Sequence, residues 1–255
     1  MIVQVVLIAL VAGAVGTAAG GAIGVLVKNP SKSYIGYMLG FAAGAMLAVS
    51  IFELLKEAVS HGEETFFGGG IVAVFVGLTL GALFVFLFEP KKAEENLTGN
   101  IECKDTAEKA KFKRLGIAVF IAIILHDLPE GLAIGAGAHV GSAWLFGAVL
   151  LLHNIPEGLA IAVPLKASGM KNLKIIGICF AAGLPTLLGA VIGYYIGMVD
   201  WLLAYTFAFA AGVMLYIVVS EMLPTAYEYA KNKKLLSVSV LSGVVLLITF
   251  ATLLH

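Results

Sequence analysis

Eight apolar segments, each long enough to cross a lipid bilayer, decide what this chain can fold into. They cover residues 2–27, 34–58, 67–88, 114–137, 143–165, 172–197, 201–226 and 235–254. A helix needs about 20 mostly apolar residues to cross the hydrocarbon core. Only helices and closed barrels satisfy their backbone hydrogen bonds there. We therefore expect an all-α membrane protein with eight transmembrane helices.

The composition agrees with this class and excludes others. The 255 residues are 60% hydrophobic and only 13% charged, whereas soluble domains average about 25% charged residues. The formal net charge is zero, so no nucleic-acid partner is indicated. Cys103 and Cys179 form no disulfide or zinc-finger framework. We expect one polytopic membrane domain over 1–255.

Basic residues are divided unequally between the loops on the two sides. Of the 16 lysine and arginine residues, 15 fall in alternate loops on one side, and only Lys56 falls on the other. Many lie in the charged stretch 89–113, which we expect to be an exposed cytoplasmic loop. Because basic loops face the cytoplasm, we expect a multi-pass protein of the cell membrane with both termini outside.

A ten-residue motif occurs twice, 27 residues apart, in the fourth and fifth apolar segments. Ionisable side chains are costly inside a bilayer and usually mark a site or a pathway. On a helix the histidine and the glutamate of each copy share one face, since they are four residues apart. The polar residues of the two copies are His126, Asp127 and Glu130, and His153, Asn154 and Glu157.

These residue types are typical of a metal site. Imidazole together with carboxylates suits Zn, Fe and Mn, whereas oxygen ligands alone favour Mg or Ca. The two histidines and two glutamates form one candidate metal position. Asp127 and Asn154 lie about 100° around their helices, so they form a second, oxygen-rich position with the glutamates as bridges. The alternative, core side chains paired only with one another, is less compatible with two copies at identical spacing.

Each motif also contains a proline, Pro129 or Pro156. Proline removes a helix hydrogen bond and frees the carbonyl four residues earlier, here that of Leu125 or Leu152. Two interpretations stay open. The loosened backbone lines a cavity beside the metal, or the kink serves packing.

A second similarity relates the second and seventh segments. Residues 40–47 match residues 208–215, and the match extends to Glu53 and Glu221. With the orientation above, these segments cross the membrane in opposite directions, which is typical of inverted transporter repeats. The repeats would be helices 1–3 and 6–8 around the helix 4/5 pair. Glycines at 16, 20 and 24 similarly echo those at 189, 193 and 197, for which close helix packing is the preferred explanation.

Other polar residues have weaker claims to function. Glu53 and Glu221 are either carboxylates at the two mouths of a transport pathway or polar residues at helix ends. His61, Glu63 and Glu64 are more typical of a solvated turn than of a site.

The eight segments and the doubled His-x-x-Pro-Glu-Gly motif resemble the ZIP (Zrt/Irt-like protein) family of divalent-metal transporters, prokaryotic branch. The resemblance implies a binuclear centre in mid-membrane. Its first position would be formed by His126, Glu130, His153 and Glu157, with Met46 also expected there, and its second by Asp127, Glu130, Asn154 and Glu157. It also implies homodimers, and transport toward the cytoplasm by movement of helices 1, 4, 5 and 6 against 2, 3, 7 and 8.

Two residues depart from the family pattern. Thr186 stands where many prokaryotic relatives have a glutamate on helix 6, so the second metal position should be weaker. Asp127 replaces the usual asparagine on helix 4 and restores a negative charge.

The leading hypothesis is therefore a secondary transporter working by alternating access. Its transported substrate would be Zn²⁺ or a similar cation such as Fe²⁺, Mn²⁺ or Cd²⁺, and no catalytic cofactor is expected. One alternative is an intramembrane metalloenzyme, but the His-Glu-x-x-His signature of zinc proteases and the Glu-x-x-His pattern of di-iron bundles are absent from the motifs. A metal-selective channel is the other alternative, since a pore also needs polar lining.

Overall fold

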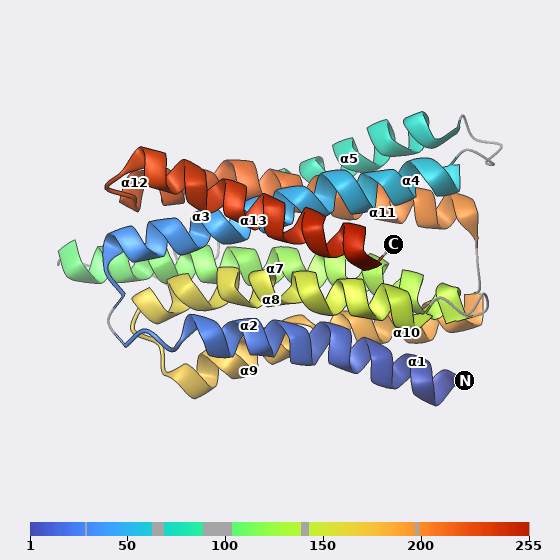
Figure 1. Cartoon of the computed structure of the whole chain (residues 1–255), viewed down its shortest axis with the longest axis horizontal. Helices are drawn as coiled ribbons and strands as arrows, with labels where there is room; N and C mark the ends of the chain where they lie inside the picture. The colour runs from blue at the N-terminus through green and yellow to red at the C-terminus, as the bar shows by residue number, and fades with distance from the viewer. Residues whose placement is uncertain (29, 63–68, 89–103, 139–142, 197–198, 255) are drawn as a thin grey trace.

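The chain folds in the computed structural model into a bundle of long helices (Figure 1). The structure describes residues 1–28, 30–62, 69–88, 104–138, 143–196 and 199–254. Within these residues, eight helices are long and apolar enough to cross a membrane, as the sequence predicts. We number them spans 1 to 8: Ile2–Gly24, Lys32–Gly62, Gly69–Leu87, Ala107–Gly137, Phe146–Ala167, Asn172–Ile196, Asp200–Tyr229 and Lys233–Phe250.

Several spans contain more than one helical element, and the elements labelled η are π-helical. In chain order the elements are α1 (Ile2–Ala9), η1 (Leu10–Val15), α2 (Gly16–Gly24), α3 (Lys32–Ala48), η2 (Val49–Leu54), α4 (Leu55–Gly62), α5 (Gly69–Phe88), α7 (Lys104–Gly137), α8 (Ala143–Ala167), α9 (Asn172–Ala182), α10 (Leu184–Ile196), α11 (Asp200–Ile217), η4 (Val218–Met222), α12 (Leu223–Tyr229) and α13 (Lys233–Leu254).

Span 4 begins earlier than the sequence predicts. Helix α7 starts at Lys104, so the last ten residues of the expected loop 89–113 are helical, and residues 89–103 lie outside the described part of the chain. The charged stretch is rich in lysine, alanine and glutamate, which are strong helix formers. Hydropathy marks only the part of a helix that lies in lipid, and this helix continues beyond it.

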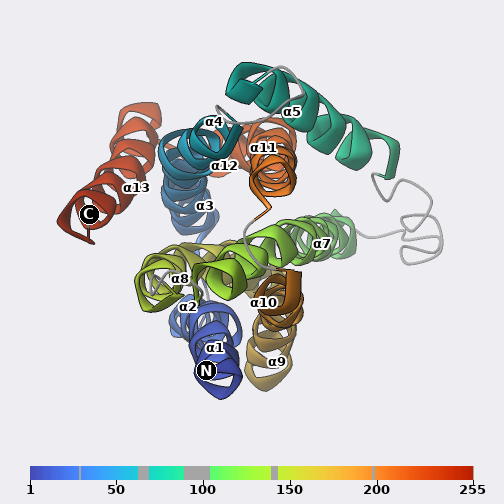
Figure 2. The ribbon, with the colours of Figure 1, turned by 90° about the vertical axis from the view of Figure 1, so that its right-hand side faces the viewer.

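Spans 4 and 5 lie in the middle of the bundle. Viewed along the helices, α7 and α8 separate α1, α2, α9 and α10 on one side from α3, α4, α5, α11, α12 and α13 on the other (Figure 2). The doubled motif therefore lies on two central helices that have other helices on both sides. This placement shields its polar side chains from lipid.

The packing of the spans repeats in the two halves of the chain. Span 1 packs mainly against span 5, and span 6 against span 4. In the same way, span 2 packs against span 8, and span 7 against span 3. Exchanging spans 1–3 with 6–8, and span 4 with span 5, reproduces each contact, as expected for inverted repeats.

Glycines at equivalent positions make these contacts close. A Cβ on Gly20 would collide with the Ile155 carbonyl, and a Cβ on Gly189 would collide with the Leu128 carbonyl. Ile155 and Leu128 occupy the same position in the two motif copies. The packing explanation is therefore confirmed for Gly20 and Gly189, which form the matching pair rather than Gly16 and Gly189, and Gly197 lies outside the described residues.

The two ends of the bundle differ in charge. The ends of α2, α8 and α12 and the starts of α3, α7, α9 and α13 lie toward the left in Figure 1. These parts carry the described lysine and arginine residues apart from Lys56. We call this the lysine-rich end. Both termini lie toward the opposite end, which we call the terminal end.

Candidate metal centre

The six polar residues of the doubled motif are buried in the middle of the bundle. His126, Asp127, Glu130, His153, Asn154 and Glu157 each have at most 2% of their surface exposed. Burying an isolated carboxylate in an apolar environment is strongly unfavourable unless it is paired or coordinates a metal. The structure thus concentrates acidic and imidazole groups where only a counter-charge could stabilise them.

The histidine of each copy faces the glutamate of the other copy. His126 Nε2 lies 2.9 Å from Glu157 Oε1, and His153 Nε2 lies 3.0 Å from Glu130 Oε2. Each pair joins α7 to α8. The two copies therefore form one site across the helix interface.

The tautomer of His126 indicates what lies between its Nε2 and the Glu157 carboxylate. Its Nδ1 lies 2.9 Å from the Ala122 carbonyl, which can only accept a hydrogen bond, so Nδ1 carries a proton. A neutral imidazole then has its lone pair on Nε2, directed at the Glu157 carboxylate. Two electron pairs that face each other at this distance need a proton or a metal cation between them.

Neighbouring spans hold the other two motif residues. Thr186 Oγ1 donates to Asp127 Oδ2 at 3.1 Å, and the Asn154 amide donates to the Ala12 carbonyl at 2.9 Å. Ala12 belongs to the π-helical turn η1 of span 1. Such turns often occur at functional sites. Spans 6 and 1 thus orient the residues at equivalent positions of the two copies.

Several ligand atoms in this site have no hydrogen-bond partner. Of the six buried side-chain atoms without one among the described residues, five belong to the motif. Buried polar atoms are normally satisfied, and a cluster of exceptions calls for an explanation such as an ion. The five atoms are Asp127 Oδ1, Glu130 Oε1, His153 Nδ1, Asn154 Oδ1 and Glu157 Oε2.

Two sets of three ligands are close enough to hold a cation. Within the described residues, His126, Asp127 and Glu157 form one set, and Glu130, His153 and Glu157 form the other. The ligand atoms of each set lie within 4.8 Å of one another. This grouping differs from the expected one, in which both histidines and both glutamates share a position. Glu157 belongs to both sets.

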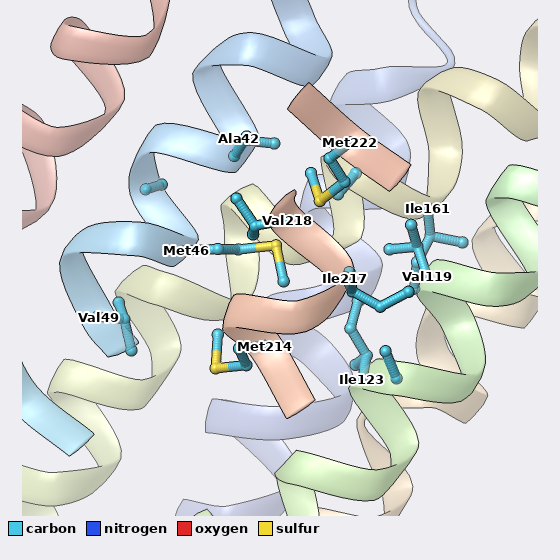
Figure 3. Packing of buried hydrophobic residues seen from close by; sticks show 14 of the residues in the cluster. Ala42, Met46, Val49, Val119, Ile123, Ile161, Met214, Ile217, Val218 and Met222 are labelled. Atoms are coloured by element: carbon cyan, nitrogen blue, oxygen red, sulfur yellow. The ribbon is translucent and has the colours of Figure 1, made fainter. Parts of the chain in front are cut away.

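Met46, the expected additional ligand, lies in a buried apolar cluster. Close by are Met214 and Val218 of span 7 (Figure 3). Its role as a ligand stays a prediction.

A cavity of about 570 Å³ borders the site. Glu130 and His153 line it, and so do Glu53, Lys56 and Glu57 from the part of span 2 that lies nearer the terminal end. A smaller cavity of about 230 Å³ lies in the other half of the bundle and is lined by Arg114 and Glu221. Glu53 and Glu221 therefore both border cavities, and their role in a transport pathway stays a prediction.

Buried apolar side chains of spans 2, 4, 5 and 7 pack together (Figure 3), and those of spans 4 and 5 precede or follow the motif on its lysine-rich side. We call this cluster the apolar plug. Ile123 lies one turn before His126, and Ile161 one turn after Glu157. Ile217 belongs to the plug and also lines the smaller cavity. The plug consists of Met46, Val119, Ile123, Ile161, Met214, Ile217 and Val218, each at most 3% exposed.

The equivalent residues on the other side of the motif are placed differently. Leu150 and Phe146 occupy the positions in α8 that Ile123 and Val119 occupy in α7. Both line the larger cavity. The repeats thus have the same contacts but differ in their surroundings: Leu150 and Phe146 border a cavity, whereas Ile123 and Val119 pack in the apolar plug. Hydropathy alone gave no signal of this difference.

Comparisons with known proteins give a consistent result. Residues 89–254 match the family described as ZIP zinc transporter. The chain is 34% identical to the zinc transporter ZupT of Chlorobium limicola over 238 residues, which cover 88% of both chains. It is 33% identical to the ZupT of Streptococcus mutans over 242 residues, covering 91% of this chain and 90% of the relative. For the ZupT of Corynebacterium aurimucosum the identity is 34% over 230 residues.

Proposed function

The chain belongs to the ZIP family of zinc transporters, and we propose that it carries Zn²⁺ and related divalent cations across the cell membrane by alternating access. The observation that carries this proposal is the crossed pairing of imidazole and carboxylate in mid-bundle. His126 faces Glu157 and His153 faces Glu130, with unpartnered oxygens beside them. Membership of a transporter family also disfavours the metalloenzyme alternative.

The donor set defines the class of substrate. One imidazole and two carboxylates make up each set, a combination that suits Zn, Fe and Mn better than Mg or Ca. We propose two cation positions that share Glu157 as a bridging carboxylate. Zn²⁺ is the first candidate because the similar proteins are named zinc transporters.

The asymmetry between the two halves supports alternating access. The larger cavity borders Glu130 and His153, whereas the smaller cavity borders Ile217 of the apolar plug and none of the six polar motif residues. Release on the other side requires the plug to open, and the inverted repeat supplies a second packing for the same spans. Spans 1, 4, 5 and 6 would move against spans 2, 3, 7 and 8. A closed plug also argues against a permanently open channel.

The charge difference between the two ends of the bundle supports an orientation in the membrane and a direction of transport. Basic segments face the cytoplasm in membrane proteins, so the lysine-rich end would be cytoplasmic and both termini outside. The larger cavity then opens outward, and transport runs toward the cytoplasm. The proposed assembly is a homodimer, which light scattering of the purified protein in detergent would test.

Uptake of radiolabelled zinc into proteoliposomes tests the site assignment. Glu130→Ala and Glu157→Ala should each abolish flux. Glu102→Ala, a matched loss of a carboxylate in the charged stretch 89–113 of the sequence, should not. Undiminished flux in both site variants would refute the assignment. Flux that rises linearly with zinc, without saturation, would favour a channel.

A further inference from the structure

A histidine and two carboxylates lie together beside the larger cavity, and one of them, Glu57, lines it. They are Glu57 and His61 of α4 and Asp200, the first residue of α11. The side chains of Glu57, His61 and Asp200 are 27%, 15% and 45% exposed. They are therefore accessible to a hydrated cation but not freely mobile in solvent.

The two nitrogens of the His61 ring face different carboxylates. Nδ1 lies 3.0 Å from Asp200 Oδ1, within hydrogen-bond distance, and Nε2 lies 3.6 Å from Glu57 Oε2. The ring also stacks on Phe207 at a centroid distance of 6.0 Å. Asp200 and Phe207 together fix the ring, and with Nδ1–H donated to Asp200, the Nε2 lone pair points toward Glu57.

The distance of 3.6 Å between His61 Nε2 and Glu57 Oε2 bears on what could lie between them. It is too long for a hydrogen bond. Two ligands each about 2.0–2.2 Å from one zinc ion, at a tetrahedral angle, lie about 3.4 Å apart. A carboxylate that holds a histidine through its other ring nitrogen is the usual arrangement around protein-bound metals. The His61 cluster has this arrangement, with Asp200 as the supporting carboxylate.

The cluster also adjoins the cavity that borders the buried site. Glu57 and Phe207 line the larger cavity, as do Glu130 and His153. A cation held between Glu57 and His61 would lie beside that cavity. With only two protein ligands, it would keep bound water and leave readily.

We propose that Glu57 and His61 form a separate, weaker site for a divalent transition-metal cation, with Asp200 as a positioning residue. The site captures the cation before it enters the cavity. The capture role rests on the proposed function, whereas the binding itself does not.

The test removes the buried site first. The variant Glu130→Ala/Glu157→Ala, purified in detergent, is dialysed against Zn²⁺, and bound zinc is counted per chain. Glu130→Gln/Glu157→Gln serves as a second background in case the first does not fold. We expect one weakly bound zinc ion that is lost on adding His61→Ala or Glu57→Gln and kept on adding Glu102→Gln. No bound zinc in either folded background, or binding that survives both His61→Ala and Glu57→Gln, would overturn the proposal.

Asp200 is tested by graded substitution. Asp200→Ala should weaken zinc binding in the same background by about 10- to 100-fold, as loss of a supporting group does at other metal sites. Asp200→Asn should restore part of it, because the amide oxygen still accepts from Nδ1–H. Equal loss in both variants would contradict the positioning role.

Measurements of zinc flux distinguish a failure of the capture site from a failure of the proposed transport function. In the otherwise unchanged chain, His61→Ala should raise the zinc concentration that gives half-maximal flux. Failure of the proposed function would appear as absence of flux in the unsubstituted chain. Failure of the capture site would leave that flux intact, with no zinc bound in the double variants.

Discussion

His126 Nε2 and Glu157 Oε1 lie 2.9 Å apart, although 31 positions separate these residues in the chain. The equivalent pair, His153 and Glu130, is separated by 23 positions. Within each helix the histidine and glutamate share a face, but each of them makes its short contact with a residue of the neighbouring helix. The site therefore exists only when α7 and α8 are packed together, and any sliding between them would change its shape.

Glu157 and Glu130 should differ in their effect on metal binding. Glu157 belongs to both ligand sets, whereas Glu130 belongs to one. We expect Glu130→Ala to retain one tightly bound Zn²⁺ per chain. Glu157→Ala should weaken both positions by more than the roughly 10- to 100-fold typical of supporting residues. Calorimetric titration of the purified variants measures this, and equal losses in the two variants would contradict the shared carboxylate.

Thr186 should support the position that contains Asp127. Its hydroxyl donates to Asp127 Oδ2, which leaves Oδ1 directed at the ligand set. Thr186→Val keeps the shape and removes the donor, so zinc affinity at this position should fall by about tenfold or more. Thr186→Ser should recover most of it. Competition with a fluorescent chelator gives the affinities. An unchanged zinc affinity in Thr186→Val would show that the hydroxyl only fills space.

Much of this arrangement follows from the sequence, and the part that does not has a physical reason. Hydropathy predicts the eight spans, because lipid requires about 20 apolar residues in each. The doubled motif predicts a polar site because charge in lipid is costly. The crossed pairing depends on the rotation and height of α7 relative to α8, which helical periodicity within one segment does not contain. The sequence assigns His61 to a solvated turn, because its partner Asp200 is 139 positions away and the pattern around His61 does not indicate it.

The apolar plug should protect its residues from reagents that reach the cavity. Leu150 lines the larger cavity, and its repeat equivalent Ile123 is fully buried. In a Cys103→Ser/Cys179→Ala background, Leu150→Cys should react with a membrane-impermeant thiol reagent added outside, severalfold faster than Ile123→Cys. Mass spectrometry of the labelled protein gives the two rates. Equal rates would mean that the two halves do not differ in their access to the reagent.

Ion pairs at the lysine-rich end should help to keep the plug closed. Lys111 Nζ of α7 lies 2.7 Å from Glu228 Oε2 of α12, and Lys32 of α3 lies 2.6 Å from Glu108 of α7. Both pairs tie the central span 4 to spans that would move relative to it. Exposed pairs contribute about 0–1 kcal/mol each, so losing one would raise the population of the opened state by at most about fivefold.

Charge reversal tests this stabilisation with the same cysteine probe. Glu228→Lys should place two positive charges together and speed the labelling of Ile123→Cys from the lysine-rich end, the proposed cytoplasmic side, measured in inverted membrane vesicles. Lys111→Glu combined with Glu228→Lys should return the rate toward its original value, because the pair is restored with opposite polarity. If the single and double variants label at the same rate, the pair does not contribute to closure, and apolar packing around Ile123 and Met214 alone holds the plug.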